Sequence, residues 1–247
     1  MDDKKRTGTL FESTPSYIFM HSGEENPSRF LHMRRCIDKL ERLGETQSFP
    51  KNHTIIRAGK IPECCYLVKS GQVVAVTETE SGNELFFCIM ETNALFGEMN
   101  MLFERILPIT FRTTVPTELI RIEKQALKEA FKNDSDIAMA ILEYAADKFF
   151  AAIDENQKMK SHNATWRLCD LLLSLAEQYG VAYDNKTLIQ KKFSIEIITS
   201  MLGVNRATTV RAIKSLKDLG LIETINGYYC IRDIELLKTH QETITSL

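Results

Sequence analysis

The spacing of hydrophobic and polar positions changes character along the chain. Between residues 46 and 122, short runs of β-branched and aromatic residues alternate with glycine-bearing turns, which is typical of antiparallel strands. The expected strands include residues 54–56, 65–68, 73–76, 85–89 and 119–122, and the turns lie at 58–60, 69–72 and 80–83. This spacing predicts an antiparallel barrel or sandwich. Helical spacing precedes it at 28–43 and follows it at 124–132.

The segment from Ser135 to about Lys160 contains no glycine or proline and predicts one long helix. One stripe repeats every four and three residues, the heptad seam of a two-stranded coiled coil. The seam consists of Ala138, Leu142, Ala145, Phe149, Ala152, Asn156 and Met159. A second stripe of Ile137, Ile141 and Tyr144 is free to pack on the β domain. An ordinary core helix of a monomer is the alternative, but two apolar stripes favour a dimer.

The C-terminal third predicts a helix at 165–179, then two short amphipathic helices within Phe193–Leu219. Gly203 lies in the turn between these two helices, because glycine adopts the left-handed conformation of a tight turn at little cost. Asn205 is expected to cap the second helix. This is the pattern of a helix-turn-helix, whose second helix enters the DNA major groove. Asn226-Gly227 then predicts a type I′ hairpin in the position of a wing.

A basic segment coincides with this motif. Residues 186–217 contain seven basic residues and one acidic residue, a net charge of +6, within a chain whose net charge is −2. A basic surface at a helix-turn-helix suits contact with phosphates, although a solvated helical face is the alternative. The candidate DNA-contacting residues are Asn205, Arg206, Ala207, Thr208, Thr209, Arg211 and Lys214.

Composition narrows the class of protein. The 247 residues are 44% hydrophobic, enough for one large domain or two smaller ones. No apolar run approaches the roughly 20 residues that cross a bilayer, and no signal-peptide pattern follows Met1. The six cysteines are scattered, and no histidines pair at metal-binding spacing. We therefore expect a cytoplasmic protein with reduced thiols, no metal and no membrane partner.

Together these features resemble the cyclic-AMP receptor protein/FNR family of bacterial transcription regulators. The resemblance covers Phe49 to Asp233 and rests on Lys69-Ser70-Gly71, Phe96-Gly97-Glu98, the long seam helix and Gly203-Val204-Asn205-Arg206 with Arg211. It implies an α+β fold: a polar arm (1–26), an antiparallel β-barrel effector domain of the double-stranded β-helix type with flanking helices (27–133), a dimerisation helix (134–162) and a winged helix-turn-helix (163–247). It also implies a homodimer that binds a palindromic site on double-stranded DNA.

The recognition helix departs from the family pattern, most notably at Ala207. The family's Arg-Glu-Thr-Val-x-Arg reads Arg206-Ala207-Thr208-Thr209-Val210-Arg211 here. Both arginines remain, and each can donate two bonds to guanine. Ala207 replaces the glutamate and is expected to touch a thymine methyl, so the DNA sequence read should differ from the commonest family site. Thr208 and Lys214 are better suited to phosphates.

The effector site departs further. Members that bind cyclic AMP hold its phosphate with an Arg-Ser pair, which falls on Leu107-Pro108 or Pro108-Ile109 here. Ala152 and Ile153 stand where polar residues contact adenine. We therefore expect no cyclic-AMP binding in the family manner, unless Arg105 or Arg112 supplies the cation. The candidate effector pocket consists of Gly97, Glu98, Arg105, Phe111, Arg112, Ala145, Phe149, Ala152 and Ile153.

The functional prediction is a DNA-binding transcription regulator modulated by an unidentified small-molecule effector, with RNA polymerase a candidate further partner. An iron–sulfur cluster is disfavoured because only Cys36 lies in the first 60 residues. No cofactor is predicted. A ligand-binding module that acts through protein contacts is the alternative. An enzyme is a remote third hypothesis, because no catalytic motif is present.

Overall fold

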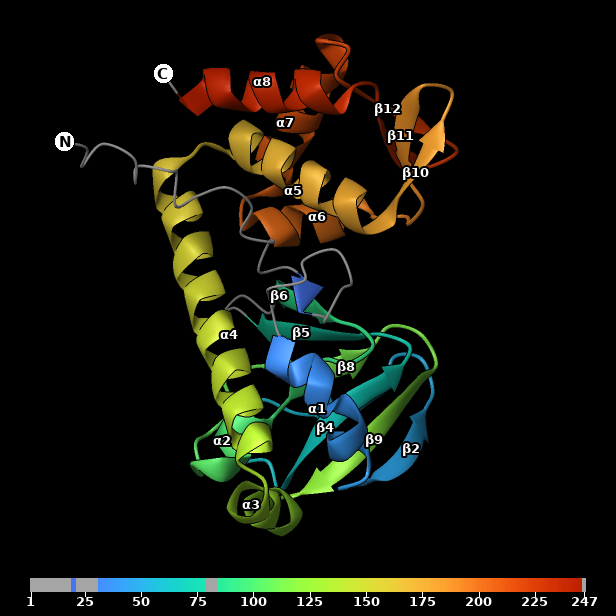
Figure 1. Ribbon diagram of the computed structural model, residues 1–247. Coiled ribbons are helices and arrows are strands. Elements are labelled where there is room, and N and C mark those ends of the chain that lie inside the picture. Colours follow the sequence, from blue (N-terminus) through green and yellow to red (C-terminus); the bar gives the residue numbers. More distant parts are fainter. Residues whose placement is uncertain (1–18, 21–30, 79–83, 246–247) are drawn as a thin grey trace, which may run out of the picture.

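The computed structural model describes residues 19–20, 31–78 and 84–245. A β domain lies at one end, a helical domain at the other, and the long helix α4 (Ser135–Ser161) runs between them along one side (Figure 1). The predicted long helix is thus confirmed. Most of the predicted polar arm 1–26 falls outside the described residues, but Phe19–Met20 form strand β1.

Two facing sheets form the β domain. Their orders are β1-β6-β5-β8-β3 and β2-β9-β4-β7, with β1 parallel to β6 and the other pairs antiparallel. The remaining strands are β2 (Glu45–Phe49), β3 (Thr54–Ile56), β4 (Cys64–Ser70), β5 (Val73–Glu78), β6 (Glu84–Met90), β7 (Leu95–Phe96), β8 (Thr110–Thr113) and β9 (Thr117–Glu123). The sheets do not close into a barrel. Gly71 has φ 90°, and a Cβ there would lie 2.6 Å from Pro116 O, so the predicted β4–β5 turn requires glycine.

Helices cover one side of the sheets. α1 (Leu31–Glu41) and α3 (Lys124–Asn133) pack with the first half of α4, and α2 (Glu98–Leu102) follows β7. Asp134 caps α4 by accepting a hydrogen bond from Asp136 N at 3.0 Å. The predicted second stripe is confirmed, since Ile137, Ile141 and Tyr144 are each at most 3% exposed against the β domain.

The C-terminal domain is a winged helix-turn-helix. Its elements are α5 (Ala164–Tyr179), β10 (Gly180–Tyr183), β11 (Lys186–Ile189), α6 (Ile195–Leu202), α7 (Arg206–Asp218), β12 (Ile222–Ile225), β13 (Tyr228–Ile231) and α8 (Ile234–Thr245). Gly203 (φ 60°), and Asn226 and Gly227 (φ 51° and 85°), have the left-handed conformations predicted for their turns. Sequence analysis missed α8 and the β10–β11 hairpin, which extends the wing to a four-stranded sheet, β10-β11-β13-β12.

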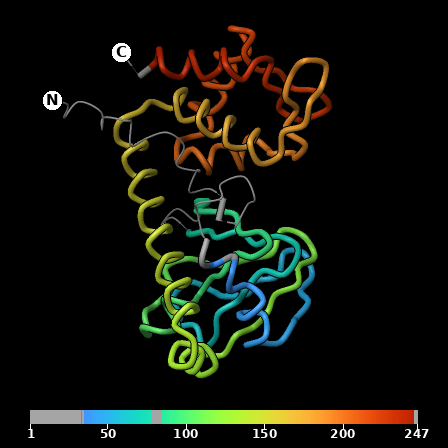
Figure 2. Tube along the Cα trace, in the orientation of Figure 1, coloured from blue at the N-terminus to red at the C-terminus, as the bar shows by residue number. Residues whose placement is uncertain are grey.

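The two domains meet where β6 lies next to α6 (Figure 2), and the side chains in this contact are mainly apolar. In β6, Cys88 pairs with Ala75 and Phe86 with Val76, so Phe87 is skipped as a β-bulge. The bulge lets both Phe86 and Ile89 pack against the core of the helical domain, although they are three residues apart. The Phe86 amide also donates to Ser200 Oγ on α6, at 2.5 Å. β6 therefore belongs to a sheet of the β domain and also contributes side chains to the core of the helical domain.

Candidate nucleic-acid interface and effector cavity

One face of α7 is exposed and the other is buried. The Asn205 side chain accepts a hydrogen bond from Thr208 N at 2.9 Å, which confirms the predicted N-cap. Arg206, Ala207, Arg211 and Lys214 are exposed. Arg211 Nη2 donates to Thr208 Oγ1 at 3.2 Å, and Arg206 pairs with Glu196 at 3.3 Å in a solvent-exposed contact. Such a contact adds little stability and yields readily to a stronger partner.

Thr209 must be removed from the candidate DNA contacts. Its side chain is fully buried between α6 and α7, where its hydroxyl pairs with Thr199 Oγ1 at 2.9 Å and donates to Asn205 O at 3.3 Å. A hydroxyl held in this way cannot reach a base edge. The side chains on either side of Thr209 are more accessible to solvent: Thr208 is half-buried and Val210 is exposed.

The basic segment 186–217 is less uniform than its charge count suggested. Lys186 binds Glu223 at 2.6 Å across the wing. Lys191 binds Glu91 of the β domain at 3.2 Å and Tyr179 Oη at 3.1 Å, and burial lowers the pKa of Lys191. These two lysines hold protein carboxylates rather than DNA phosphates. The exposed arginines and lysines of α7 remain available.

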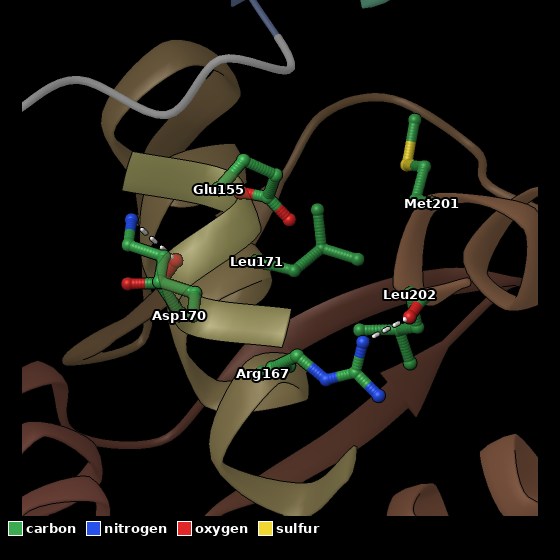
Figure 3. Close-up of a pocket in the computed structure, with 7 residues that line it drawn as sticks. Glu155, Arg167, Asp170, Leu171, Met201 and Leu202 are labelled. Atoms are coloured by element: carbon green, nitrogen blue, oxygen red, sulfur yellow. Dashed lines mark hydrogen bonds and ion pairs between the residues drawn. The ribbon is translucent and has the colours of Figure 1, made fainter. Parts of the chain in front are cut away.

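The C-terminal end of α4 is joined to the helix-turn-helix by a charged cluster (Figure 3). Lys158 bridges Asp154 at 3.0 Å and Asp170 of α5 at 3.1 Å. Arg167 Nη1 donates to the carbonyl oxygen of Leu202, the last residue of α6, at 2.8 Å. The space among these side chains is about 10 Å³, which holds at most one water molecule. The cluster therefore connects helices and is too small for a ligand.

A larger cavity of about 180 Å³ opens between the β domain and α4. Its walls are mainly apolar and come from β6, β7, α2, β8 and the loop before β8. The lining residues are Phe87, Cys88, Met90, Phe96, Gly97, Glu98, Met99, Asn100, Leu107, Ile109, Phe111 and Lys148. Burial raises the pKa of Cys88 to about 12, so its thiol is protonated at neutral pH.

The charged groups of this cavity form one buried pair. Lys148 Nζ lies 2.8 Å from Glu98 Oε1, and the Glu98 side chain is 2% exposed. The same ammonium donates to Leu95 O at 2.8 Å and lies 4.2 Å from the centre of the Tyr144 ring. Burial alone would lower the pKa of Lys148, but Glu98 and Tyr144 outweigh it, so the pKa is raised. Lys148 therefore stays protonated beside the buried carboxyl group of Glu98.

Of the predicted pocket residues, Gly97, Glu98 and Phe111 line the cavity. The two predicted cations do not. Arg105 is exposed on the loop after α2, and Arg112 follows inward-facing Phe111 on β8, so its side chain projects from the opposite face of that strand. The cavity therefore lacks the cation that a cyclic phosphate would need beyond the already paired Lys148.

The predicted helix residues also differ from those observed. Ala145, Phe149, Ala152 and Ile153 do not line the cavity; Ala152 packs beside it, whereas Phe149 is 63% and Ile153 45% exposed. The helix contributes Lys148, which sequence analysis missed. A signal existed, because Lys148 continues the stripe that faces the β domain, four residues after Tyr144, and a lysine on an apolar stripe requires a partner.

The rest of α4 carries an exposed apolar face. Met139, Leu142, Phe149, Phe150 and Ile153 are between 45% and 64% exposed. Of the predicted seam, Leu142, Phe149, Asn156 and Met159 are exposed, whereas Ala138, Ala145 and Ala152 are half-buried. The exposed stripe is thus rotated away from the predicted alanines and includes Ile153.

No helix within residues 31–78 and 84–245 is both long and apolar enough to span a bilayer. Across the same residues, no three His, Cys, Asp or Glu side chains gather as they would around a metal ion. All six cysteines are buried and unpaired.

A β domain with a lined cavity, a long helix with an exposed apolar face and a winged helix-turn-helix define a two-domain transcription regulator. Residues 46–134 match the family model of the cyclic nucleotide-binding domain, and residues 167–240 match that of the Crp-like helix-turn-helix domain. The chain belongs to the CRP/FNR family of transcription regulators, with an effector-binding domain and a DNA-binding helix-turn-helix.

Individual relatives are distant. The chain is 25% identical over 175 residues to the cAMP-activated global transcriptional regulator CRP of Pasteurella multocida, covering 70% of this chain and 83% of the relative. It is 22% identical over 178 residues to the global nitrogen regulator of Nostoc, covering 71% and 80%. The c-di-GMP responsive regulator CLP of Xanthomonas campestris shares the fold with a TM-score of 0.71, at 19% identity over 81% of this chain and 99% of that one.

Proposed function

We propose that two copies of the chain associate along α4 and present their α7 helices to successive major grooves of a palindromic DNA site. The observation that carries this proposal is that α7 has one exposed face and one buried face. Arg206 and Arg211 are exposed on one face, while Thr209, Ile213 and Leu216 anchor the other in the core. A helix held in this way presents its arginines in a fixed geometry, and arginine can bond guanine through two atoms.

The exposed face of α4 supports the dimer. Leu142, Phe149 and Ile153 lie at spacings of seven and four residues, which is the period of a coiled-coil seam, and Asn156 follows at three. Three large apolar side chains about half exposed on one helix would expose a contiguous apolar stripe in a monomer. We place the seam on Leu142, Phe149, Ile153 and Asn156, with Met159 beyond them.

An effector in the cavity would contact both elements that connect the domains, namely helix α4 and strand β6. Lys148 belongs to α4, whose last turn is tied to α5 by Lys158 and approaches the helix-turn-helix turn: a Cβ at Gly203 would lie 3.3 Å from Met159 Cε. Phe87, Cys88 and Met90 belong to β6, whose other face packs on α6. Binding that moves either element would shift the population of winged-helix orientations.

The effector differs from cyclic AMP held in the usual family manner. Leu107 and Ile109 line the cavity at the positions where the family's phosphate-binding Arg-Ser pair would lie. Neither side chain offers a cation or a hydroxyl. An unpaired buried phosphate costs several kcal/mol. We therefore assign a different small molecule to this site, and RNA polymerase as a further partner once DNA is bound.

The test is selection of bound sequences from a random duplex pool, followed by fluorescence anisotropy on the enriched site. We expect an inverted repeat, with affinity for it at least about a thousandfold above that for unrelated duplex. The double substitution Arg206→Ala, Arg211→Ala should remove this preference. Enrichment of no sequence at any salt concentration would favour the alternative, a regulatory module that acts through protein contacts.

A further inference from the structure

We propose that the cavity between the β domain and α4 binds a small, uncharged, aromatic molecule that carries a hydrogen-bond donor, such as a phenol or an indole. This inference rests on the proposed function, since it names the ligand class of the same effector site. Size, wall chemistry, charge and hydrogen bonding each restrict the ligand.

The volume of the cavity admits a ligand of one or two rings. The cavity measures about 180 Å³, whereas sites for drug-sized ligands usually measure 300–1,000 Å³. An engineered apolar cavity of about 150 Å³ in another protein binds benzene. A benzene-sized ring with a substituent, or an indole, therefore fits this space.

The walls favour a planar apolar ring. The Phe96 and Phe111 rings lie 4.6 Å apart between centres, and Tyr66 stacks behind Phe96 at 5.6 Å. Phe96 and Phe111 both line the cavity, together with Met90 and Met99. Aromatic edges and faces and methionine sulfur all make favourable contacts with an aromatic guest.

The charged pair disfavours an ion. Lys148 has three N–H donors: two are used by Glu98 Oε1 and Leu95 O, and the ammonium packs over the Tyr144 ring. A carboxylate or phosphate ligand at this lysine would lie beside the buried carboxyl group of Glu98, which disfavours a second negative charge. An ammonium ligand would add a second buried cation. A neutral ligand avoids both costs.

The Glu98 carboxyl group can accept a further hydrogen bond, which favours a ligand that carries a hydrogen-bond donor. Lys148 occupies Oε1 of Glu98, and a carboxylate accepts further hydrogen bonds at its second oxygen. Glu98 lines the cavity, so a ligand O–H or N–H can donate to it. Hydrogen bonds to charged acceptors are stronger than those between neutral groups, which separates phenol from toluene.

The test is isothermal titration calorimetry on the full chain with phenol, indole, toluene, benzoate, benzylamine and cyclic AMP. We expect phenol and indole to bind, toluene about tenfold more weakly, and the charged compounds more weakly still. Ile109→Trp, which fills the cavity, should abolish phenol binding. The matched Ile106→Trp, at a 65% exposed position of the same loop, should leave it unchanged. Glu98→Gln should weaken the binding of phenol about tenfold and change the binding of toluene little.

Benzoate or cyclic AMP binding more tightly than phenol would overturn the inference, as would phenol binding that Ile109→Trp does not alter. Anisotropy on the selected DNA site is measured in parallel. DNA preference without phenol or indole binding refutes only the ligand class. Phenol binding at this cavity without DNA preference refutes the proposed function and leaves the ligand class standing.

Discussion

Arg206 and Thr209 lie three residues apart on α7 and have opposite surroundings. Arg206 is 65% exposed in its side chain, whereas Thr209 is fully buried and bonded to Thr199. Arginine in the first turn of a recognition helix reads bases, while a lysine further along neutralises phosphate. We therefore expect the residues of α7 to divide into those that specify sequence, those that add affinity and those that hold the helix in place.

The first prediction separates specificity from affinity. Arg206→Ala should cost about 1–3 kcal/mol at the base pair that it reads and relax the preference there. Lys214→Ala should weaken binding to all duplexes about equally and reduce the slope of log K against log salt by about one per half-site. Anisotropy titrations on matched and mismatched duplexes at several salt concentrations measure both effects. Equal loss of discrimination in the two variants would contradict these roles.

The second prediction tests the removal of Thr209 from the interface. Thr209→Val keeps the shape but deletes the buried hydroxyl, so the free energy of unfolding should fall by about 1 kcal/mol while DNA discrimination is kept. Thr208→Val, next to it but half-buried beside Arg211, is the matched control: it should leave the free energy of unfolding unchanged and weaken binding to all duplexes about equally. Thermal denaturation and anisotropy give the two readouts. A change of base preference in Thr209→Val would restore it as a contact.

At the scale of elements, α4 carries three different surfaces. Ile137, Ile141 and Tyr144 cover the β domain, Lys148 reaches the cavity, and Leu142 and Phe149 face solvent. Its last turn binds α5 through Lys158. One helix thus lines the cavity, contacts the DNA-binding domain and carries an exposed apolar surface.

The third prediction concerns that exposed surface. Leu142→Glu places a charge in the seam of each chain, so the two copies repel and the dimer should dissociate at micromolar concentration. Leu236→Glu, at a 58% exposed position of α8 against 61% for Leu142, is the matched control and should remain dimeric. Sedimentation equilibrium measures the mass. A wild-type chain that sediments as a monomer would refute the seam itself.

Local chemistry explains which features could be predicted from the sequence. The turns at Gly203 and Asn226-Gly227 and the cap at Asn205 were predictable because each depends on neighbouring residues only. The role of Lys148 depends on Glu98, fifty residues away, and the burial of Thr209 depends on the way α6 packs on α7. Arg105 and Arg112 were near the cavity in sequence, but loop direction and strand alternation place them elsewhere.

At the scale of the molecule, two connections link the domains. One is α4 with its charged cluster at Lys158. The other is the contact of β6 with α6, continued by Glu91, which accepts hydrogen bonds from Gln72 Nε2 at 2.5 Å and Tyr179 Oη at 2.7 Å and pairs with Lys191 at 3.2 Å. The winged helix is thus joined to the rest of the molecule at two places.

The fourth prediction tests the second connection. Lys191→Met leaves the Glu91 carboxylate without its cation, so the free energy of unfolding should fall by about 1–3 kcal/mol, and amides of β6 and α6 should exchange faster. Adding Glu91→Gln should restore part of the loss, because no charge is then left unpaired. Lys192→Met is the control, since Lys192 is exposed and packs over Tyr228 within its own domain. Full additivity of the two substitutions would show that the pair is uncoupled.

Hydroxyl-radical footprinting of the full chain on its selected DNA site tests the central claim most directly, namely that two α7 helices read one duplex. The account predicts two protected segments on the same face, about 34–36 Å apart, which is one helical turn. Arg206→Ala should weaken both segments together. A single protected segment, or protection unrelated to sequence, would contradict the account.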